Sequence, residues 1–244
     1  MNMLNEPRSH MDQNDERQAL RKEAEALNPV VATLEEDIVL GRLHPRERLL
    51  EDELMRRFGV KRHVIRQGLA ELEQMGIVER VPNRGALVRT YEPSEIQQLY
   101  VVRDLLETNA ARLIPMPLRE ADLDELKEVQ LKHDKAVEAG ELGQVFHSNM
   151  EFHEVLFSKA GNQYLSEAIK QFALRTHGIR FYCLTYPGYL HQARLEHWQM
   201  IRAIEICDRQ SLVKLCGQHL LASRACYEKV ARGVVDGSRN AQAS

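Results

Sequence analysis

The sequence predicts a mainly α protein in two parts, an N-terminal winged helix-turn-helix followed by an all-α bundle of six helices. Two observations predict this fold. Between Leu49 and Met75 two short helical runs meet at Gly59, and two β-prone runs follow at once. Beyond Tyr91 the β-prone runs stop, and the remaining apolar residues recur at helical spacing between proline and glycine breaks.

The composition is that of a globular protein with room for two domains. The chain has 244 residues, of which 43% are hydrophobic and 28% charged. No apolar run approaches the ~20 residues of a membrane helix, and nothing resembles a signal peptide, so we expect a cytoplasmic protein without a membrane partner. The cysteines form no C-x-x-C pair and are expected to be reduced packing residues: Cys183, Cys207, Cys216 and Cys226.

The N-terminal residues show no sustained apolar period, which indicates a flexible arm. The first helix is expected to open at Asn28-Pro29, where a cap residue precedes proline at the first helical position, and to end at Gly41. The predicted domain boundaries are a flexible arm over 1–27, a winged helix-turn-helix domain over 28–92, an all-α domain over 93–233 and a disordered tail over 234–244.

The helix-turn-helix presents basic residues on one face. Its second helix has an apolar stripe at Ile65, Leu69 and Leu72, so Arg62 and Arg66 share a face away from that stripe. The window 54–66 holds five basic residues and no acidic one. Such a face suits phosphates and guanine edges, because arginine donates two parallel hydrogen bonds to O6 and N7. A solvated charged face is the alternative interpretation.

A β-hairpin is predicted directly after this helix. Gly76 is expected to end the helix as a C-cap. Two β-prone runs, 77–81 and 86–89, then flank the turn-forming residues Pro82-Asn83-Arg84-Gly85. A helix-turn-helix followed by a hairpin is a winged helix.

Residues 30–90 resemble the DNA-binding domain of the GntR family of bacterial transcription regulators. The residues that carry the resemblance are Ile38, Gly41, Leu43, Pro45, Arg48-Leu49, Glu53-Leu54, Phe58-Gly59-Val60, Arg62, Val64-Ile65-Arg66, Leu69, Leu72, Gly76, Val78 and Pro82-Asn83-Arg84-Gly85. The resemblance implies that operator DNA is bound by Arg56, Lys61, Arg62, His63, Arg66, Arg84 and Gly85. The chain departs from the family pattern at Arg46, Lys61, His63, Gln67 and Gly68. Because Lys61 and His63 lie where the family reads sequence, we expect an operator that differs from the family's common ones.

The all-α domain is predicted to contain six helices. The first starts at a capping box, Ser94-Glu95-Ile96-Gln97, and runs to about Ile114 before Pro115 and Pro117. The other five are expected over 119–139, 142–160, 162–184, 189–207 and 210–232.

Three of these helices carry histidines that could converge. His153 follows Asn149 by four residues, so both side chains lie on one helical face. His197 and His219 lie in the fifth and sixth predicted helices. Each alone would be explained as a structural histidine. The remaining histidines match no such pattern and are expected to be structural or exposed: His133, His147, His177 and His191.

Together the three histidines resemble the FadR C-terminal domain, the FCD module that follows many GntR-type winged helices. The matching segments are Asn149-Met150-Glu151-Phe152-His153, Glu196-His197 with Ile201, and His219-Leu220. Six helices are closer to the VanR-like branch, and the resemblance covers residues 30–232.

The FCD resemblance implies a divalent metal ion on Asn149, His153, His197 and His219. Three imidazoles and an amide oxygen suit Zn²⁺ first, with Ni²⁺, Fe²⁺ and Mn²⁺ as alternatives. Asn149 is neutral where many relatives have Asp, so the ion would keep its full charge and attract a carboxylate more strongly. Arg103 matches the family's "R..LE" and could clamp that carboxylate; an ion pair with Glu107 is the alternative.

The sequence therefore predicts a non-enzymatic, ligand-responsive transcription regulator, most simply a repressor. A homodimer would place two winged helices on operator DNA, and a small carboxylate effector would weaken that binding. Two alternatives stay open. The three histidines could form a metal-dependent hydrolase site, or the chain could be a DNA-binding protein without an effector.

Overall fold

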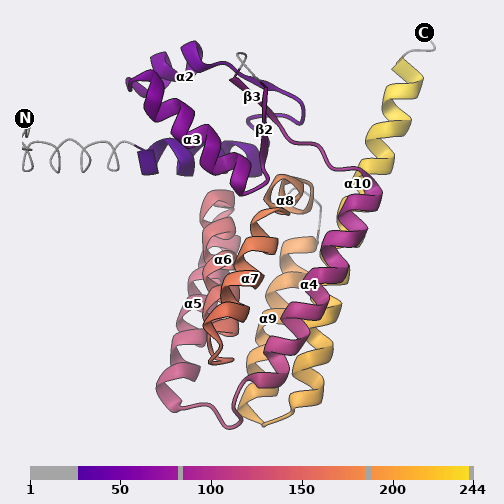
Figure 1. Ribbon diagram of the computed structural model, residues 1–244. Helices are drawn as coiled ribbons and strands as arrows, with labels where there is room; N and C mark the ends of the chain where they lie inside the picture. The colour runs from indigo at the N-terminus through magenta and orange to yellow at the C-terminus, as the bar shows by residue number, and fades with distance from the viewer. Residues whose placement is uncertain (1–26, 82–84, 185–187, 242–244) are drawn as a thin grey trace, which may run out of the picture.

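The computed structural model describes residues 27–81, 85–184 and 188–241, and their fold is mainly α, as predicted (Figure 1). The N-terminal part contains a helix over residues 27–39, β1 (Arg48–Leu49), α2 (Glu51–Phe58), α3 (Arg62–Gln74), β2 (Val78–Val81) and β3 (Gly85–Val88). The C-terminal part contains α4 (Pro93–Leu113), α5 (Glu120–Ala139), α6 (Leu142–Ser158), α7 (Gln163–Leu174), α8 (His177–Leu184), α9 (Tyr189–Glu205) and α10 (Arg209–Ala241). In these residues no helix has the length and apolar character needed to cross a bilayer.

The helix-turn-helix forms where the sequence predicts it. Gly59 ends α2 in the left-handed conformation, at φ +65°, which glycine adopts without a steric penalty. Val60 packs on the buried cluster that contains Ile65 and Leu72. The buried stripe of α3 therefore holds the helix against its neighbours and leaves Arg62 and Arg66 exposed.

The predicted hairpin is part of a three-stranded sheet with the order β1-β3-β2. In the hairpin Val81 pairs with Gly85, and on the other side of β3 Arg48 pairs with Leu87. The two-residue strand β1 was not predicted, because its pairing with a distant strand leaves no local pattern. Gly85 is required sterically: a Cβ there would lie 2.2 Å from the carbonyl oxygen of Leu49.

Two predicted helix starts are too late in the sequence. Leu27 is already helical and packs into the winged-helix core, so Asn28 is not the N-cap of the first helix. The capping box of α4 is formed by Glu92 and Glu95 instead of Ser94 and Gln97. Pro93 explains this shift, because its missing N–H and fixed φ favour the first helical position. Most of the predicted arm, 1–26, lies outside the described residues.

The predicted tail is also partly helical. The structure continues α10 to Ala241, whereas the sequence predicts the end of this helix at Arg232 and disorder over 234–244. One glycine inside a helix costs only about 1 kcal/mol, so Gly233 alone does not end it. Residues 242–244 lie outside the described residues.

The described residues of the C-terminal part form seven helices, not six. The predicted fourth helix divides into α7 and α8 at Arg175 and Thr176. Thr176 Oγ1 donates a hydrogen bond to the carbonyl oxygen of Ala173, which competes with continuation of the helical ladder. The resemblance to the VanR-like branch rests on six helices and loses that support.

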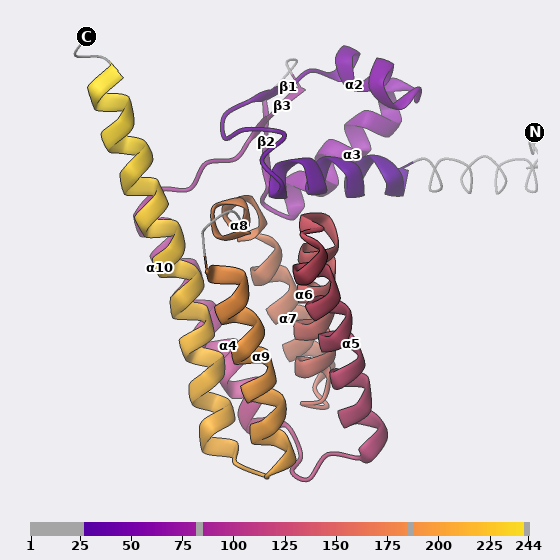
Figure 2. The same cartoon turned by 180° about the vertical axis from the view of Figure 1, so that it is seen from behind.

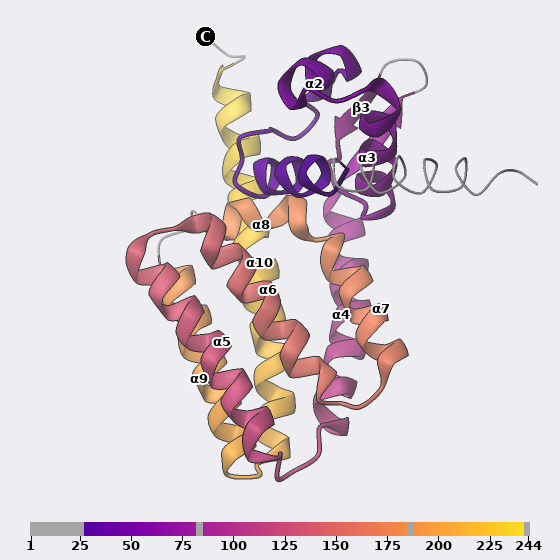
Figure 3. The same cartoon turned by 90° about the vertical axis from the view of Figure 1, so that its left-hand side faces the viewer.

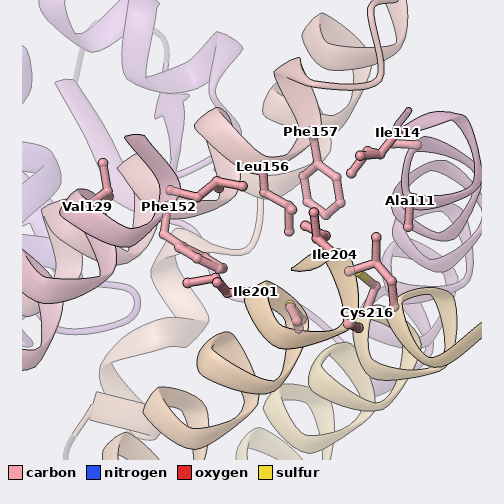
Figure 4. Close-up of a cluster of buried hydrophobic side chains, with 14 of the residues drawn as sticks. Ala111, Ile114, Val129, Phe152, Leu156, Phe157, Ile201, Ile204 and Cys216 are labelled. Atoms are coloured by element: carbon pink, nitrogen blue, oxygen red, sulfur yellow. The ribbon is translucent and has the colours of Figure 1, made fainter. Parts of the chain in front are cut away.

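Six of the seven helices, all except α8, enclose one main apolar core. Figure 4 shows Phe152 and Leu156 of α6 facing Ile201 and Ile204 of α9, with Cys216 of α10 beside them. Seen from behind, α10 and α9 lie at one side of the bundle and α5 and α6 at the other (Figure 2). The core therefore fixes α6, α9 and α10, the helices that carry His153, His197 and His219.

The winged helix sits on one end of the bundle. Figure 3 shows the helix over 27–39 lying across the ends of α6 and α8. Its side chains contact both helices: Glu36 Oε2 lies 3.6 Å from His147 Nε2, and Glu35 Oε1 lies 2.6 Å from His177 Nδ1. A Cβ on Gly143 would lie 3.3 Å from Glu36 Oε1.

Candidate metal centre and basic helix

The histidines of α6, α9 and α10 converge. His153, His197 and His219 each offer a ring nitrogen, and these three atoms lie within 4.8 Å of one another. The ring centroids are 5.0 to 5.1 Å apart for all three pairs. This near-equal spacing places three imidazoles around one point, which is a donor set that suits a divalent transition metal ion.

Hydrogen bonds set the tautomer of His197. Its Nδ1 lies 2.8 Å from Gln130 Oε1, and the amide nitrogen of Gln130 donates to Asp134 Oδ1. Because the Gln130 oxygen only accepts, Nδ1 of His197 must donate, and the neutral ring carries its lone pair on Nε2. Asp134 is itself held by Trp198 Nε1 and Arg194 Nε, each at 2.9 Å. These hydrogen bonds fix the orientation of the His197 ring. Metal-bound imidazoles are commonly oriented in the same way, by a partner that accepts from the ring nitrogen not bound to the metal.

A carboxylate sets the tautomer of His219 in the same way. His219 Nδ1 lies 2.7 Å from Glu196 Oε2, and Gln192 Nε2 donates to Glu196 Oε1. Burial raises the pKa of Glu196, but the hydrogen bonds from His219 and Gln192 lower it more, so the net pKa is below its ordinary value. An ionised Glu196 accepts from Nδ1 of His219 and leaves Nε2 of that ring as the donor atom for an ion.

Asn149 is buried one helical turn before His153 on α6. Its Nδ2 is buried without a hydrogen-bond partner in the described part of the chain. Amide nitrogen and oxygen have nearly the same shape, so rotating the amide would put Oδ1 in that position. The structure thus leaves Asn149 able to offer an oxygen, which is the atom that the predicted metal site requires.

Two histidines that match no predicted ligand position are buried. His133 lies beside the three histidines, with its ring centroid 5.4 Å from that of His197 and its Nδ1 3.0 Å from Ser148 Oγ. Burial lowers the pKa of His133 to about 4, although Asp134 raises it. It is therefore a neutral neighbour of the site. The sequence offered one signal, the three-residue spacing from Gln130, but that spacing is common. His177 lies at the boundary with the winged helix.

A cavity of about 270 Å³ opens next to His153, between α4, α6 and α7. Its walls are apolar side chains and paired charges, and include Arg103, Glu107, Met150, His153, Phe157, Ile169 and Lys170. Arg103 is buried, and its Nε donates to Glu107 Oε1 at 2.8 Å. The ion pair considered as the alternative for Arg103 is thus present, and the same guanidinium lines the cavity.

The basic face of α3 is exposed and pairs with acidic residues of α2. Arg62 Nη1 lies 3.2 Å from Glu51 Oε2, and Arg66 Nε lies 3.0 Å from Glu51 Oε1. Arg62 also pairs with Asp52. Such exposed pairs contribute little free energy and can exchange for phosphates. The sequence window 54–66 missed these partners because Glu51 and Asp52 lie in the first turn of α2, before the window begins.

The other predicted DNA-binding residues surround this face. Lys61 is the N-cap of α3 and makes no side-chain cap hydrogen bond to the first turn of the helix. Arg56 and His63 are exposed, and Arg56 Nε donates to the carbonyl oxygen of Asp52. Arg84 lies outside the described residues.

Comparisons with known proteins group the chain with bacterial regulators. Residues 27–88 match the family described as "Bacterial regulatory proteins, gntR family". Residues 98–222, more than half of the chain, match the family described as "FCD domain".

Individual relatives and solved structures agree with these matches. The uncharacterized HTH-type transcriptional regulator YdhC of Bacillus subtilis is 29% identical over 196 residues, which cover 78% of this chain and 83% of that protein. The HTH-type transcriptional repressor RspR of Escherichia coli is 22% identical over 187 residues, 77% of this chain and 82% of that protein. The structure of E. coli McbR/YncC superposes with a TM-score of 0.73 at 21% identity, covering 84% of this chain and 98% of that chain. At that identity the structural likeness supports the fold alone.

Proposed function

This protein belongs to the GntR family of bacterial regulatory proteins and carries an FCD domain, and on that premise we propose that it is a repressor released from operator DNA by a small carboxylate. It is a DNA-binding transcription regulator with an effector-binding domain. The name of RspR, a transcriptional repressor, supports the sign of regulation. Because the relatives are transcription regulators, regulation is favoured over a three-histidine hydrolase. Because the proposed target is operator DNA, we expect the protein to act in the cytoplasm.

The exposed basic face of α3 is the observation that carries the DNA-binding part of the proposal. Arg62 and Arg66 lie on one face of the second helix of a helix-turn-helix, which enters the major groove in such domains. We assign base or phosphate contacts to Arg56, Lys61, Arg62, His63 and Arg66, with Arg84 and Gly85 in the wing. In the free protein Glu51 forms ion pairs with Arg62 and Arg66, and these pairs would be replaced by contacts to DNA.

A divalent metal ion fits the three histidines. The fit rests on His197 and His219, whose Nδ1 atoms are committed to Gln130 and Glu196 and whose Nε2 atoms therefore carry lone pairs. The ion would be held by these residues together with His153 and Asn149. Zn²⁺ suits this donor set, with Ni²⁺, Fe²⁺ and Mn²⁺ as alternatives. A bound ion would supply positive charge and open coordination positions for a carboxylate.

The cavity beside His153 is the proposed effector site. Arg103 of α4 and His153 of α6 both line it, so one carboxylate could meet a guanidinium and an ion held by His153 together. The cavity favours an effector-responsive protein over a DNA-binding protein without a ligand. Arg103 must then exchange part of its pairing with Glu107 for the effector.

A homodimer is proposed because residues 27–81, 85–184 and 188–241 contain one helix-turn-helix and readers of this kind bind paired half-sites. An apolar stripe supports a dimer surface on α4, where Val101, Leu105 and Leu113 are all more than half exposed. Leu221 is similarly exposed on α10, which lies beside α4 in both opposite views (Figures 1 and 2). Exposed apolar patches of this kind mark association surfaces.

Substitution in α3 tests the DNA-binding assignment. Duplexes selected by the wild-type protein from a random-sequence pool would be used to measure affinity by fluorescence anisotropy. Arg62→Ala and Arg66→Ala should each weaken binding by about 1–3 kcal/mol and relax the selected sequence if they read bases. Lys132→Ala, an exposed lysine on α5, is the control. A double variant with unchanged affinity and footprint would refute the assignment.

A further inference from the structure

The segment Arg175–Thr176–His177 joins α7 to α8, with His177 as the first residue of α8, and contacts residues of both the effector cavity and the winged helix. It contains the break that divides the predicted fourth helix. Each of its three side chains has a different partner. We call it the 175–177 turn.

Thr176 is linked to the cavity by Arg103, which lines the cavity and is hydrogen-bonded to Thr176. Arg103 Nη1 donates to Thr176 Oγ1 at 3.1 Å, while Nε of the same guanidinium donates to Glu107. The hydroxyl proton of Thr176 goes to the carbonyl oxygen of Ala173, so Thr176 can only accept from Arg103. Thr176 is 1% exposed, and water cannot readily replace the guanidinium if Arg103 moves.

His177 faces the winged helix. Its Nδ1 lies 2.6 Å from Glu35 Oε1, in the helix over 27–39. Its Nε2 lies 3.2 Å from the sulfur of Met150, which lines the effector cavity. The ring is also packed edge-on against Phe146, with centroids 5.0 Å apart. His177 is therefore fixed between the two domains.

Arg175 touches the end of α3. A Cβ on Gly76 would lie 3.1 Å from Arg175 Cγ and 3.1 Å from Tyr91 Oη. Tyr91 Oη donates to the carbonyl oxygen of Gly76 at 2.5 Å. Gly76 lies two residues after the end of α3, the helix that carries Arg62 and Arg66, so movement of Arg175 would change the contacts at that end of the DNA-reading helix.

We propose that the 175–177 turn transmits occupancy of the effector cavity to the winged helix, with Thr176 and His177 as positioning residues. The proposal rests on the proposed function for its ligand and specifies the regulation of that site. A carboxylate that draws on the donors of Arg103 competes with Thr176 for the guanidinium. Loss of that donor loosens the turn, and the contacts to Glu35 and Gly76 loosen with it.

Hydrogen exchange of the full-length protein, without ligand or DNA, tests this coupling. Thr176→Val keeps the shape of the side chain and removes the acceptor for Arg103. Amides in 27–39 and 72–77 should then exchange roughly fivefold faster, as expected for one lost hydrogen bond, while those of α5 stay unchanged. Thr176→Ser restores a hydroxyl and should return the wild-type rates.

A second pair of variants approaches the turn from the cavity. Arg103→Met should accelerate exchange of the same amides. Lys170→Met removes another cation of the cavity wall, one that is bonded to Glu154 and not to the turn, and should leave their exchange unchanged. Unchanged exchange in 27–39 and 72–77 for Thr176→Val would overturn the proposal, as would an equal effect of Thr176→Ser. Neither result depends on metal, carboxylate or operator binding, so failure of the proposed function would be seen separately in those assays.

Discussion

The side chains behind two of the three histidines decide which of their ring nitrogens can bind an ion. Gln130 accepts from Nδ1 of His197, and Glu196 accepts from Nδ1 of His219. Both bonds hold the rings in the tautomer that a metal ion requires, before any ion arrives. The preorganisation therefore depends on residues that touch the histidines and not the ion.

Changing Gln130 should weaken metal binding without removing a ligand. Gln130→Leu deletes the acceptor for Nδ1 of His197, so the ring can rotate or change tautomer, and affinity for Zn²⁺ should fall roughly 10- to 100-fold. Competition with a chromophoric chelator measures this affinity. Lys132→Ala, an exposed residue of the same helix, serves as control, while His197→Ala should abolish binding. Equal Zn²⁺ affinity for Gln130→Leu and the wild type would contradict the role of Gln130 in orienting His197.

Lys61 is a poor cap for the helix that it precedes. The GntR pattern has Ser at this position, whereas Lys61 provides no cap hydrogen bond to the first turn of α3. Lys61→Ser should therefore raise the free energy of unfolding of the winged helix by about 1 kcal/mol. Urea denaturation would measure the change, with Lys61→Ala as control for loss of the lysine alone. No difference between the two variants would show that serine does not cap α3 here.

Among the elements, those with local signals were predicted and those with distant partners were not. Gly59 marks the turn of the helix-turn-helix, and Pro82-Asn83-Arg84-Gly85 mark the hairpin, within a few residues of the elements they join. The strand β1 depends on a distant partner, β3. The break at Thr176 involves a local bond to Ala173 as well as a distant one from Arg103, and a threonine in a helical run does not by itself indicate a break. The convergence of the histidines came from family resemblance, because periodicity places a residue on a face but does not bring three helices together.

The α4 helix should carry the dimer contact. Leu105→Glu puts a charge in the exposed apolar stripe of α4, and should convert the dimer to a monomer in sedimentation velocity at micromolar concentration. Leu131→Glu on α5 is a matched control, because Leu131 is 50% and Leu105 58% exposed. Dissociation by the α5 variant alone would move the interface to another face. A wild-type protein that is monomeric both free and on operator DNA would contradict the dimer.

At the scale of the whole molecule, the candidate site ties together helices that are far apart in the sequence. His153, His197 and His219 come from α6, α9 and α10, and the cavity beside them reaches α4 and α7. The winged helix rests on the ends of α6 and α8 (Figure 3). A change of order in the bundle can therefore affect the winged helix through α6 and α8, which contact its first helix.

Zinc should stabilise the folded bundle measurably. An ion that binds the folded chain and not the unfolded one adds a free energy of RT ln(1 + [L]/Kd), about 2.7 kcal/mol when the free ion exceeds Kd by 100-fold. Added Zn²⁺ should accordingly raise the melting temperature of the wild type, and the dialysed protein should hold about one ion per chain by metal analysis. His219→Ala removes one of three imidazoles and should lose most of the shift, while His191→Ala, an exposed histidine on α9, should keep it. If the wild type holds no metal, shows no thermal shift with Zn²⁺ or Ni²⁺ and binds a carboxylate regardless of chelator, the histidines act on the carboxylate by hydrogen bonding alone.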